Sequence, residues 1–135
     1  MGQYLLDSNA FIWAKSAPSV LKREAREVIE NPENTLFVSM ACLWELADKA
    51  SKGKWPEFDL IMQHQPDGLA GALQQSGMFV MPIEIFHIDA AYRLPLLHRD
   101  PFDRMMIAQA MAEDLIVITA DRVFGRYAGL RVLAA

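Results

Sequence analysis

The stretch Leu115-Ile116-Val117-Ile118-Thr119-Ala120-Asp121 joins an uninterrupted apolar run to a polar turn. A run of apolar, largely β-branched residues without polar alternation is typical of a strand that is buried on both faces. Such strands belong to parallel sheets that are covered by helices on both sides. The segment therefore predicts an inner strand over residues 115–118, with Thr119 and Asp121 at its carboxyl end.

A second strand with a similar ending is predicted near the start of the chain. The apolar run over residues 3–6 stops at Asp7-Ser8-Asn9, three residues that favour turns and helix starts. Residues 35–38 are rich in β-forming side chains and predict a further strand. Two more strands are expected, one over residues 79–85 with an interruption at Pro82, and an edge strand over residues 131–133.

Helical patterns alternate with these strands. Helices are predicted over residues 11–15, 20–30, 40–51, 89–94 and 101–113, and two short helices between residues 55 and 77. Ser39 and Asp100 are good N-caps, and Pro101 is favoured at the first helical position. Alternating strands and helices predict a parallel sheet with helices on both faces. We expect one domain over residues 1–135, an α/β fold built as a three-layer α/β/α sandwich.

Composition limits the classes of protein to be considered. The chain has 17 acidic and 13 basic residues, a formal net charge of −4, which is not the charge of a generally phosphate-seeking surface. With 53% apolar and 22% charged residues it is too apolar to be disordered, and no apolar run is long enough for a membrane span. The single cysteine, Cys42, excludes an intramolecular disulfide and indicates a cytoplasmic protein.

Two acidic residues, Asp7 and Asp121, are expected at the carboxyl ends of strands, where open parallel sheets bind ligands. Each of them alone is explained equally well as a helix cap. Together they are more informative, because two like charges near each other require a compensating cation. Mg²⁺ or Mn²⁺ is the usual partner of clustered carboxylates.

Asp103 and Glu45 are further candidate metal ligands, but each of them also has an ordinary structural explanation. Asp103 lies in the first turn of its predicted helix, where an acid favours the helix dipole, yet it shares the apolar face of Met106 and Ile107. An acid on a buried face needs a partner. Glu45 lies nearly opposite the apolar stripe of its helix, and Lys49 four residues later fits an ordinary surface pair. The helical pattern alone therefore favours a surface role for Glu45.

The segment His98-Arg99-Asp100-Pro101-Phe102-Asp103-Arg104-Met105-Met106-Ile107-Ala108-Gln109-Ala110 resembles the HxDPFDRxLIAQA stretch of PIN-domain toxins, the VapC-like ribonucleases of bacterial toxin–antitoxin pairs. Three other motifs follow the order of that family. Residues 5–9 resemble its opening strand-Asp-x-Asn/Ser/Thr, residues 39–46 its Ser-x5-Glu-Leu helix, and residues 118–121 its closing Thr-x-Asp. Glu45 is retained as a candidate because its position matches the second motif.

The resemblance implies a metal-dependent endoribonuclease that is the toxin of a toxin–antitoxin pair. It implies a pocket of carboxylates that holds one or two Mg²⁺ or Mn²⁺ ions and is formed by Asp7, Glu45, Asp103 and Asp121. The implied partners are an RNA substrate, a cognate antitoxin and a second copy of the chain, with no membrane. Without these four acids the remaining 13 acidic residues equal the 13 basic ones, so the whole net charge is assigned to the pocket.

Supporting roles are expected for four further residues. Asn9 and Thr119 would orient water or a neighbouring carboxylate, and Ser39 is a candidate for the same role with an N-cap as the alternative. Arg104 is a candidate phosphate contact, with a solvated helix end as the alternative. His98 counts as a neighbour of the phosphate only through its place in the motif.

Two other functions stay open from the residues. One is a phosphatase or phosphotransfer domain in which Asp7 is phosphorylated, although Asn9 stands where a two-aspartate phosphatase would have its second Asp. The other is a PIN-like binding module that has kept the fold and lost the activity. The presence of all four acids speaks against this module.

Overall fold

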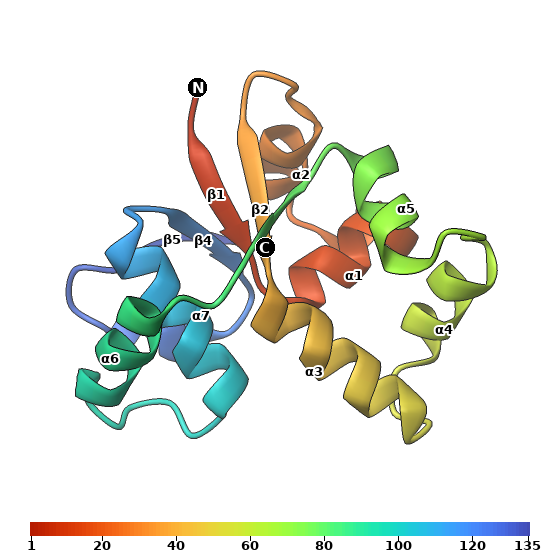
Figure 1. Ribbon diagram of the computed structural model, residues 1–135. Coiled ribbons are helices and arrows are strands. Elements are labelled where there is room, and N and C mark those ends of the chain that lie inside the picture. Colours follow the sequence, from red (N-terminus) through yellow and green to blue (C-terminus); the bar gives the residue numbers. More distant parts are fainter.

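A computed structural model describes residues 1–135 and shows a five-stranded sheet with helices on both sides (Figure 1). The strands are β1 (Gln3–Leu6), β2 (Thr35–Ser39), β3 (Phe79–Met81), β4 (Ile116–Thr119) and β5 (Arg131–Ala134). Their order in the sheet is β3-β2-β1-β4-β5, and every pairing is parallel. The predicted α/β fold with a parallel central sheet is confirmed.

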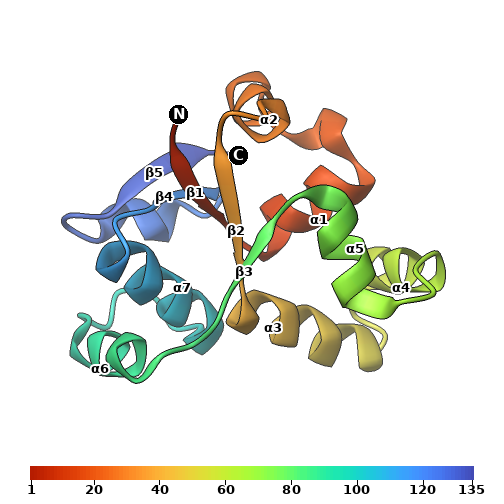
Figure 2. The same cartoon turned by 45° about the horizontal axis from the view of Figure 1, so that its top comes forward.

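Seven α-helices and two short 3₁₀ helices connect the strands. They are α1 (Ser8–Ser16), η1 (Pro18–Val20), α2 (Arg23–Glu30), α3 (Met40–Ser51), α4 (Pro56–Gln63), α5 (Gly68–Ser76), α6 (Ile85–Arg93), α7 (Pro101–Ala112) and η2 (Arg122–Arg126). The connections from β1 to β3 run in one direction across the sheet, and the connection from β3 to β4 runs back. Because such crossovers are right-handed, α1 and α2 lie on one face and α6 and α7 on the other, as Figure 2 shows.

The reversal of strand order places a topological switch point between β1 and β4. Leu6 of β1 pairs with Ile118 of β4, so the next residues, Asp7 and Thr119, lie side by side at the carboxyl edge of the sheet. Crevices at such switch points are where open parallel sheets bind ligands. The topology therefore brings the chain's first and last motifs together.

The inner strands are buried on both faces, as the apolar runs predict. Leu5 and Leu6 of β1 and Val117 and Ile118 of β4 are all fully buried. Neighbouring residues of a strand point to opposite faces, so both faces of the sheet are covered. Each such side chain contributes about 1.5–3 kcal/mol by leaving water.

Local capping signals account for the helix starts that were predicted correctly. The hydroxyl of Ser39 accepts the N–H of Ala41, and α3 has the predicted bounds. The carboxylate of Asp100 accepts the N–H groups of Phe102 and Asp103 at the start of α7. Both caps have the side-chain oxygen that the first turn of a helix requires.

The predicted elements between residues 79 and 94 are wrong at their boundaries. The strand ends at Met81, and α6 begins at Ile85 instead of residue 89. The ring Nδ1 of His87 accepts the N–H of Glu84 at 3.0 Å and so caps the first turn. A histidine is not a usual capping residue, and the sequence pattern therefore did not indicate this start. None of the helices has the length and apolar character that a membrane crossing requires.

Candidate active site

Asp7 is held rigidly at the carboxyl end of β1. Its side chain caps α1, because Oδ1 accepts the N–H of Ala10 at 2.8 Å. Its Oδ2 accepts a hydrogen bond from the hydroxyl of Thr119, the last residue of β4, at 2.5 Å. Asp7 is 5% exposed, so its carboxylate is oriented by neighbours and not by water. Each oxygen keeps a further lone pair for another ligand.

Glu45 lies in α3 and is 3% exposed, which corrects the surface position that its helical pattern favoured. The helix packs against α7 as well as against the core, so its buried face is wider than the apolar stripe. The hydroxyl of Ser8 donates to Oε1 of Glu45 at 2.5 Å, and Nζ of Lys49 donates to Oε2 at 2.7 Å. The predicted ion pair between Glu45 and Lys49 is confirmed. The carboxylate of Glu45 is buried, however, so this is not an ordinary surface pair.

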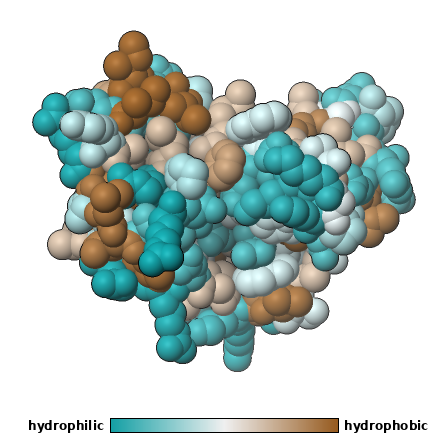
Figure 3. Space-filling model, turned by 90° about the horizontal axis from the view of Figure 1, so that it is seen from below, coloured by the Kyte–Doolittle hydropathy of each residue, from teal (hydrophilic) through white to brown (hydrophobic).

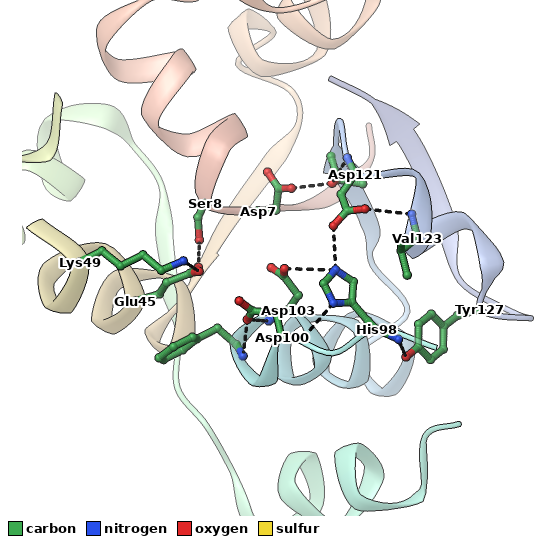
Figure 4. A network of polar contacts seen from close by, with 12 residues as sticks. Asp7, Ser8, Glu45, Lys49, His98, Asp100, Asp103, Asp121, Val123 and Tyr127 are labelled. Carbon is green, nitrogen blue, oxygen red and sulfur yellow. Dashed lines mark hydrogen bonds and ion pairs between the residues drawn. The ribbon is translucent and has the colours of Figure 1, made fainter. Parts of the chain in front are cut away.

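Asp103 and Asp121 both point toward the same ring nitrogen of His98 (Figure 4). Asp121 follows β4 and caps η2, with Oδ1 accepting the N–H of Val123 at 2.9 Å. Its Oδ2 lies 2.7 Å from Nε2 of His98. Oδ2 of Asp103, from α7, lies 3.3 Å from the same nitrogen. One ligand atom from each of these three residues lies within 4.8 Å of the other two.

Burial, and to a smaller extent the neighbouring charges, change the pKa of Asp7. Burial raises the pKa of Asp7 from 3.8 to about 6. The hydrogen bonds from Thr119 and from the N–H of Ala10 act in the opposite direction, and the charges of Asp121 and Glu45 raise the pKa further. Asp7 follows β1, whereas Asp121 follows β4 and Glu45 lies in α3. The charges of these acids nevertheless raise the pKa of Asp7.

Asp103 shows the same effect more strongly. Burial raises the pKa of Asp103 from 3.8 to about 8. Further increases come, in decreasing order, from the charges of Asp100, Glu45, Asp7 and Asp121. All four acids that the sequence singled out are thus gathered at one place, where their charges disfavour the ionisation of Asp7 and Asp103.

Lys49 is the basic side chain that bonds to this group of acids. Burial lowers the pKa of Lys49, but the hydrogen bond to Glu45 and the charges of Glu45, Asp100 and Asp103 outweigh it and raise the pKa above 10.5. One ammonium group leaves most of the negative charge unbalanced. Carboxylate oxygens only accept, so a further cation is the chemical complement of this set.

The surface around the pocket matches this distribution of charge. Figure 3 shows the face seen from below, the side on which the strands end, and this face is hydrophilic and hollowed near its centre. Hydrophobic side chains gather in patches toward its edges.

The PIN domain profile matches residues 4–130, which is nearly the whole chain. The chain belongs to the PIN domain family. The family expected from the motifs is thereby confirmed. No curated protein matches the chain in sequence.

Several solved structures share the fold of this PIN domain. It is similar to VapBC2 from Rickettsia felis bound to a DNA fragment from their promoter, with a TM-score of 0.67, 16% identity and 98% of each chain covered. It is similar to DNA-bound VapBC from Salmonella typhimurium, with a TM-score of 0.67 and 22% identity over 99% of this chain and 98% of that one. A toxin–antitoxin complex from Klebsiella pneumoniae gives a TM-score of 0.58 and 18% identity over 96% and 95%. At these identities the likeness shows the fold.

Three of the predicted supporting residues of this PIN domain lie apart from the carboxylate contacts. Asn9 is exposed and makes no side-chain hydrogen bond. The hydroxyl of Ser39 caps α3 and donates to Oε1 of Gln109 at 2.5 Å. The guanidinium of Arg104 donates to the carbonyl oxygens of Ala91 at 2.8 Å and Pro95 at 3.3 Å. Of the four, only Thr119 bonds to a pocket acid.

Two residues of the pocket were missed or only partly indicated by sequence reasoning. Ser8 bonds to Glu45, which is 37 positions away, and its place directly after Asp7 was the available signal. His98 was associated with the phosphate through its motif, but its contacts are with Asp121 and Asp103. Neither contact follows from local periodicity.

Proposed function

We propose that this PIN domain is a metal-dependent endoribonuclease, the toxin of a toxin–antitoxin pair, which hydrolyses RNA phosphodiester bonds. The observation that carries the proposal is the gathering of Asp7, Glu45, Asp103 and Asp121 at the switch point of the sheet. PIN domains are generally nucleases and typically use divalent metal ions, which supports a hydrolytic role for this pocket. The similar VapBC structures support the role of toxin.

The donor set of the pocket fits Mg²⁺ or Mn²⁺. These ions prefer carboxylate oxygens, and burial together with the charges of the neighbouring acids raises the pKa values of Asp7 and Asp103, which a bound cation would offset. One or two ions held by these carboxylates would supply an activated water and would neutralise charge on the phosphodiester. No protein side chain then has to act as the nucleophile.

The protein side chains orient the acids and meet the substrate. Thr119 fixes Asp7, and Ser8 fixes Glu45, so the free lone pairs of both carboxylates keep a set direction. Lys49 keeps 37% of its side chain exposed at the rim of the pocket. Its ammonium group has three donors and uses one of them on Glu45, so it can also hold a phosphate oxygen of the RNA.

The activity is tested by RNA cleavage with Mg²⁺ or Mn²⁺, with EDTA, and with the variants Asp7→Asn and Asp103→Asn. We expect cleavage only in the presence of a divalent ion and its loss in both variants. Asp89→Asn is a matched control, because Asp89 is an exposed acid paired with Arg93 on α6. Equal cleavage in EDTA would overturn the mechanism. Mn²⁺ binding without any cleavage would favour the catalytically silent binding module.

An antitoxin and a second copy of the chain are the proposed protein partners. Large apolar side chains are exposed on and just after α6, namely Ile85, Phe86, Ile88, Tyr92 and Leu96. Contiguous exposed apolar side chains mark protein contact surfaces. Light scattering of the purified chain tests the second copy, and a monomer would contradict it.

The toxin role has a separate test. Expression of the chain should arrest growth, and co-expression of a small DNA-binding protein encoded directly upstream should restore it. The Asp103→Asn variant is the control, and it should not arrest growth. Normal growth with the active chain expressed would contradict the toxin role but not the nuclease.

A further inference from the structure

His98 brings a ring nitrogen into contact with two acids of the pocket, Asp121 and Asp103. We infer that His98 is a positioning residue that donates a hydrogen bond from Nε2 to Asp121, and that it is not a ligand of the ion. The inference rests on the proposed metal-dependent function. It assigns to the ion a coordination shell of oxygen atoms only.

Proximity alone would make His98 a ligand. Its Nε2, with oxygens of Asp103 and Asp121, forms a set of three donor atoms that lie within 4.8 Å of one another. A histidine binds a metal through a ring nitrogen that carries a lone pair and no proton. The tautomer of the ring therefore decides between ligand and hydrogen-bond donor.

A backbone N–H determines that tautomer. The N–H of Asp100 donates to Nδ1 of His98 at 3.1 Å, so Nδ1 must present its lone pair. A neutral imidazole carries one proton, which consequently lies on Nε2. Nε2–H then has no lone pair for a metal, and Oδ2 of Asp121 at 2.7 Å is its acceptor. Oδ2 of Asp103 at 3.3 Å is a second, more distant acceptor.

The surroundings prevent the ring from turning so that Nδ1 points into the pocket in place of Nε2. The backbone N–H of His98 donates to the hydroxyl of Tyr127 at 2.8 Å, and that hydroxyl donates to the carbonyl of Pro95 at 2.9 Å. The ring lies edge-on to Phe124, with 5.5 Å between the centroids and 87° between the planes. Only 11% of the side chain is exposed. A turned ring would also leave the N–H of Asp100 without its acceptor.

His98 thereby has the same role toward Asp121 that Thr119 has toward Asp7 and Ser8 has toward Glu45. Each of these three acids accepts a hydrogen bond from a neighbouring side chain that orients it. Oδ1 of Asp121 also accepts the N–H of Val123, so the whole carboxylate is oriented. A shell of carboxylate oxygens favours Mg²⁺ and Mn²⁺ over the metals that prefer imidazole, such as Zn²⁺.

The tautomer is tested directly by ¹⁵N NMR of the imidazole in the metal-free protein at alkaline pH. We expect a proton on Nε2 and none on Nδ1. A proton on Nδ1 would overturn the inference. This measurement requires neither a variant nor a bound ion, so it is independent of the proposed activity.

The absence of a nitrogen ligand is tested by pulsed electron paramagnetic resonance of the wild-type protein with Mn²⁺. We expect no coupling from a directly coordinated ¹⁴N nucleus. Such a coupling in the wild-type protein, lost in His98→Gln, would overturn the inference and leave the proposed function intact. A wild-type protein that binds no Mn²⁺ would overturn the proposed function, and with it the assignment of His98 to a metal pocket.

The positioning role is tested by calorimetry of Mn²⁺ binding to two variants. His98→Gln keeps an N–H donor near the position of Nε2, whereas His98→Leu has none. Loss of an outer hydrogen-bond partner lowers metal affinity by about 10–100-fold, so we expect that loss in the leucine variant and a loss below about threefold in the glutamine variant. Equal affinities of both variants, with circular dichroism showing an intact fold, would overturn the role as a donor.

Discussion

The protein contains two histidines with restricted exposure and a carboxylate partner, and their surroundings differ in charge. His87, 1% exposed on α6, has a closed set of partners: Nδ1 accepts the N–H of Glu84, and Nε2 lies 3.0 Å from Oε1 of Glu113. His98 faces two carboxylates at once, Asp121 and Asp103.

The difference separates a structural polar cluster from a functional one. Around His87 one carboxylate meets one ring, and the neighbouring Gln109 completes the network with Ser39 and the carbonyl of Pro82. Around His98 two carboxylates share one ring N–H. A satisfied network holds helices in place, whereas carboxylates that share one donor keep oxygen lone pairs for a further partner.

The largest expected effect concerns catalysis. Asp103→Asn should lower RNA cleavage by more than about 100-fold, because loss of a charged ligand costs more than loss of an outer partner. Glu113→Gln, the matching change at the other histidine, should stay within about threefold, because an exposed partner outside the pocket contributes little. Initial rates at saturating Mn²⁺ measure both. A comparable loss in Glu113→Gln would erase the distinction between the two clusters.

The second effect is on stability without metal. Asp103 and Asp7 have pKa values of about 8 and about 6 in the folded protein, above the ordinary 3.8, so the folded state binds more protons than the unfolded state. Stability should therefore fall by a few kcal/mol in all as pH rises from about 4 to about 8, and then level off. Urea unfolding in EDTA measures this slope.

Two controls sharpen the pH prediction. Asp103→Asn should remove most of the slope, and saturating Mn²⁺ should reverse it, because the ion binds only the ionised carboxylates. A metal-free protein whose stability is flat or rises between pH 5 and 8 would contradict the raised pKa values.

The third comparison is between two hydroxyls. Thr119→Val removes the donor to Asp7 and should weaken Mn²⁺ binding by about 10-fold. Ser39→Ala removes the cap of α3 and the bond to Gln109, and should lower the free energy of unfolding by about 1–2 kcal/mol with little change in metal affinity. Calorimetry of both variants measures the Mn²⁺ affinity, and denaturant titration measures the free energy of unfolding. Equal losses of metal affinity would place Ser39 at the pocket.

The smallest expected effects are at Asn9 and Arg104. Asn9→Ala should leave cleavage within about twofold, because surface side chains without partners contribute little. Arg104→Ala should lower stability by about 1 kcal/mol through its lost carbonyl contacts, with unchanged affinity for RNA. Filter binding of RNA to the Asp103→Asn background measures the affinity. A marked drop in RNA binding would return Arg104 to the role of phosphate contact.

Local sequence signals predicted the parts of the fold that depend on neighbouring residues. The bounds of α3 and the cap at Asp100 followed from the preferences of the first helical turn. The start of α6 was missed because a histidine caps it. The burial of Glu45 was missed because α3 packs against α7, and the periodicity of one helix contains no information about a second contact face.

The sequence by itself determined the alternation of strands and helices, the apolar inner strands, and the positions of Asp7 and Asp121 after strand ends. These follow from side-chain periodicity and turn preferences, which act over a few residues. Only the tertiary structure decided which donors the acids have. Ser8 meets Glu45 and His98 meets Asp121 across 37 and 23 positions, because packing of separate elements, and not local pattern, sets such contacts.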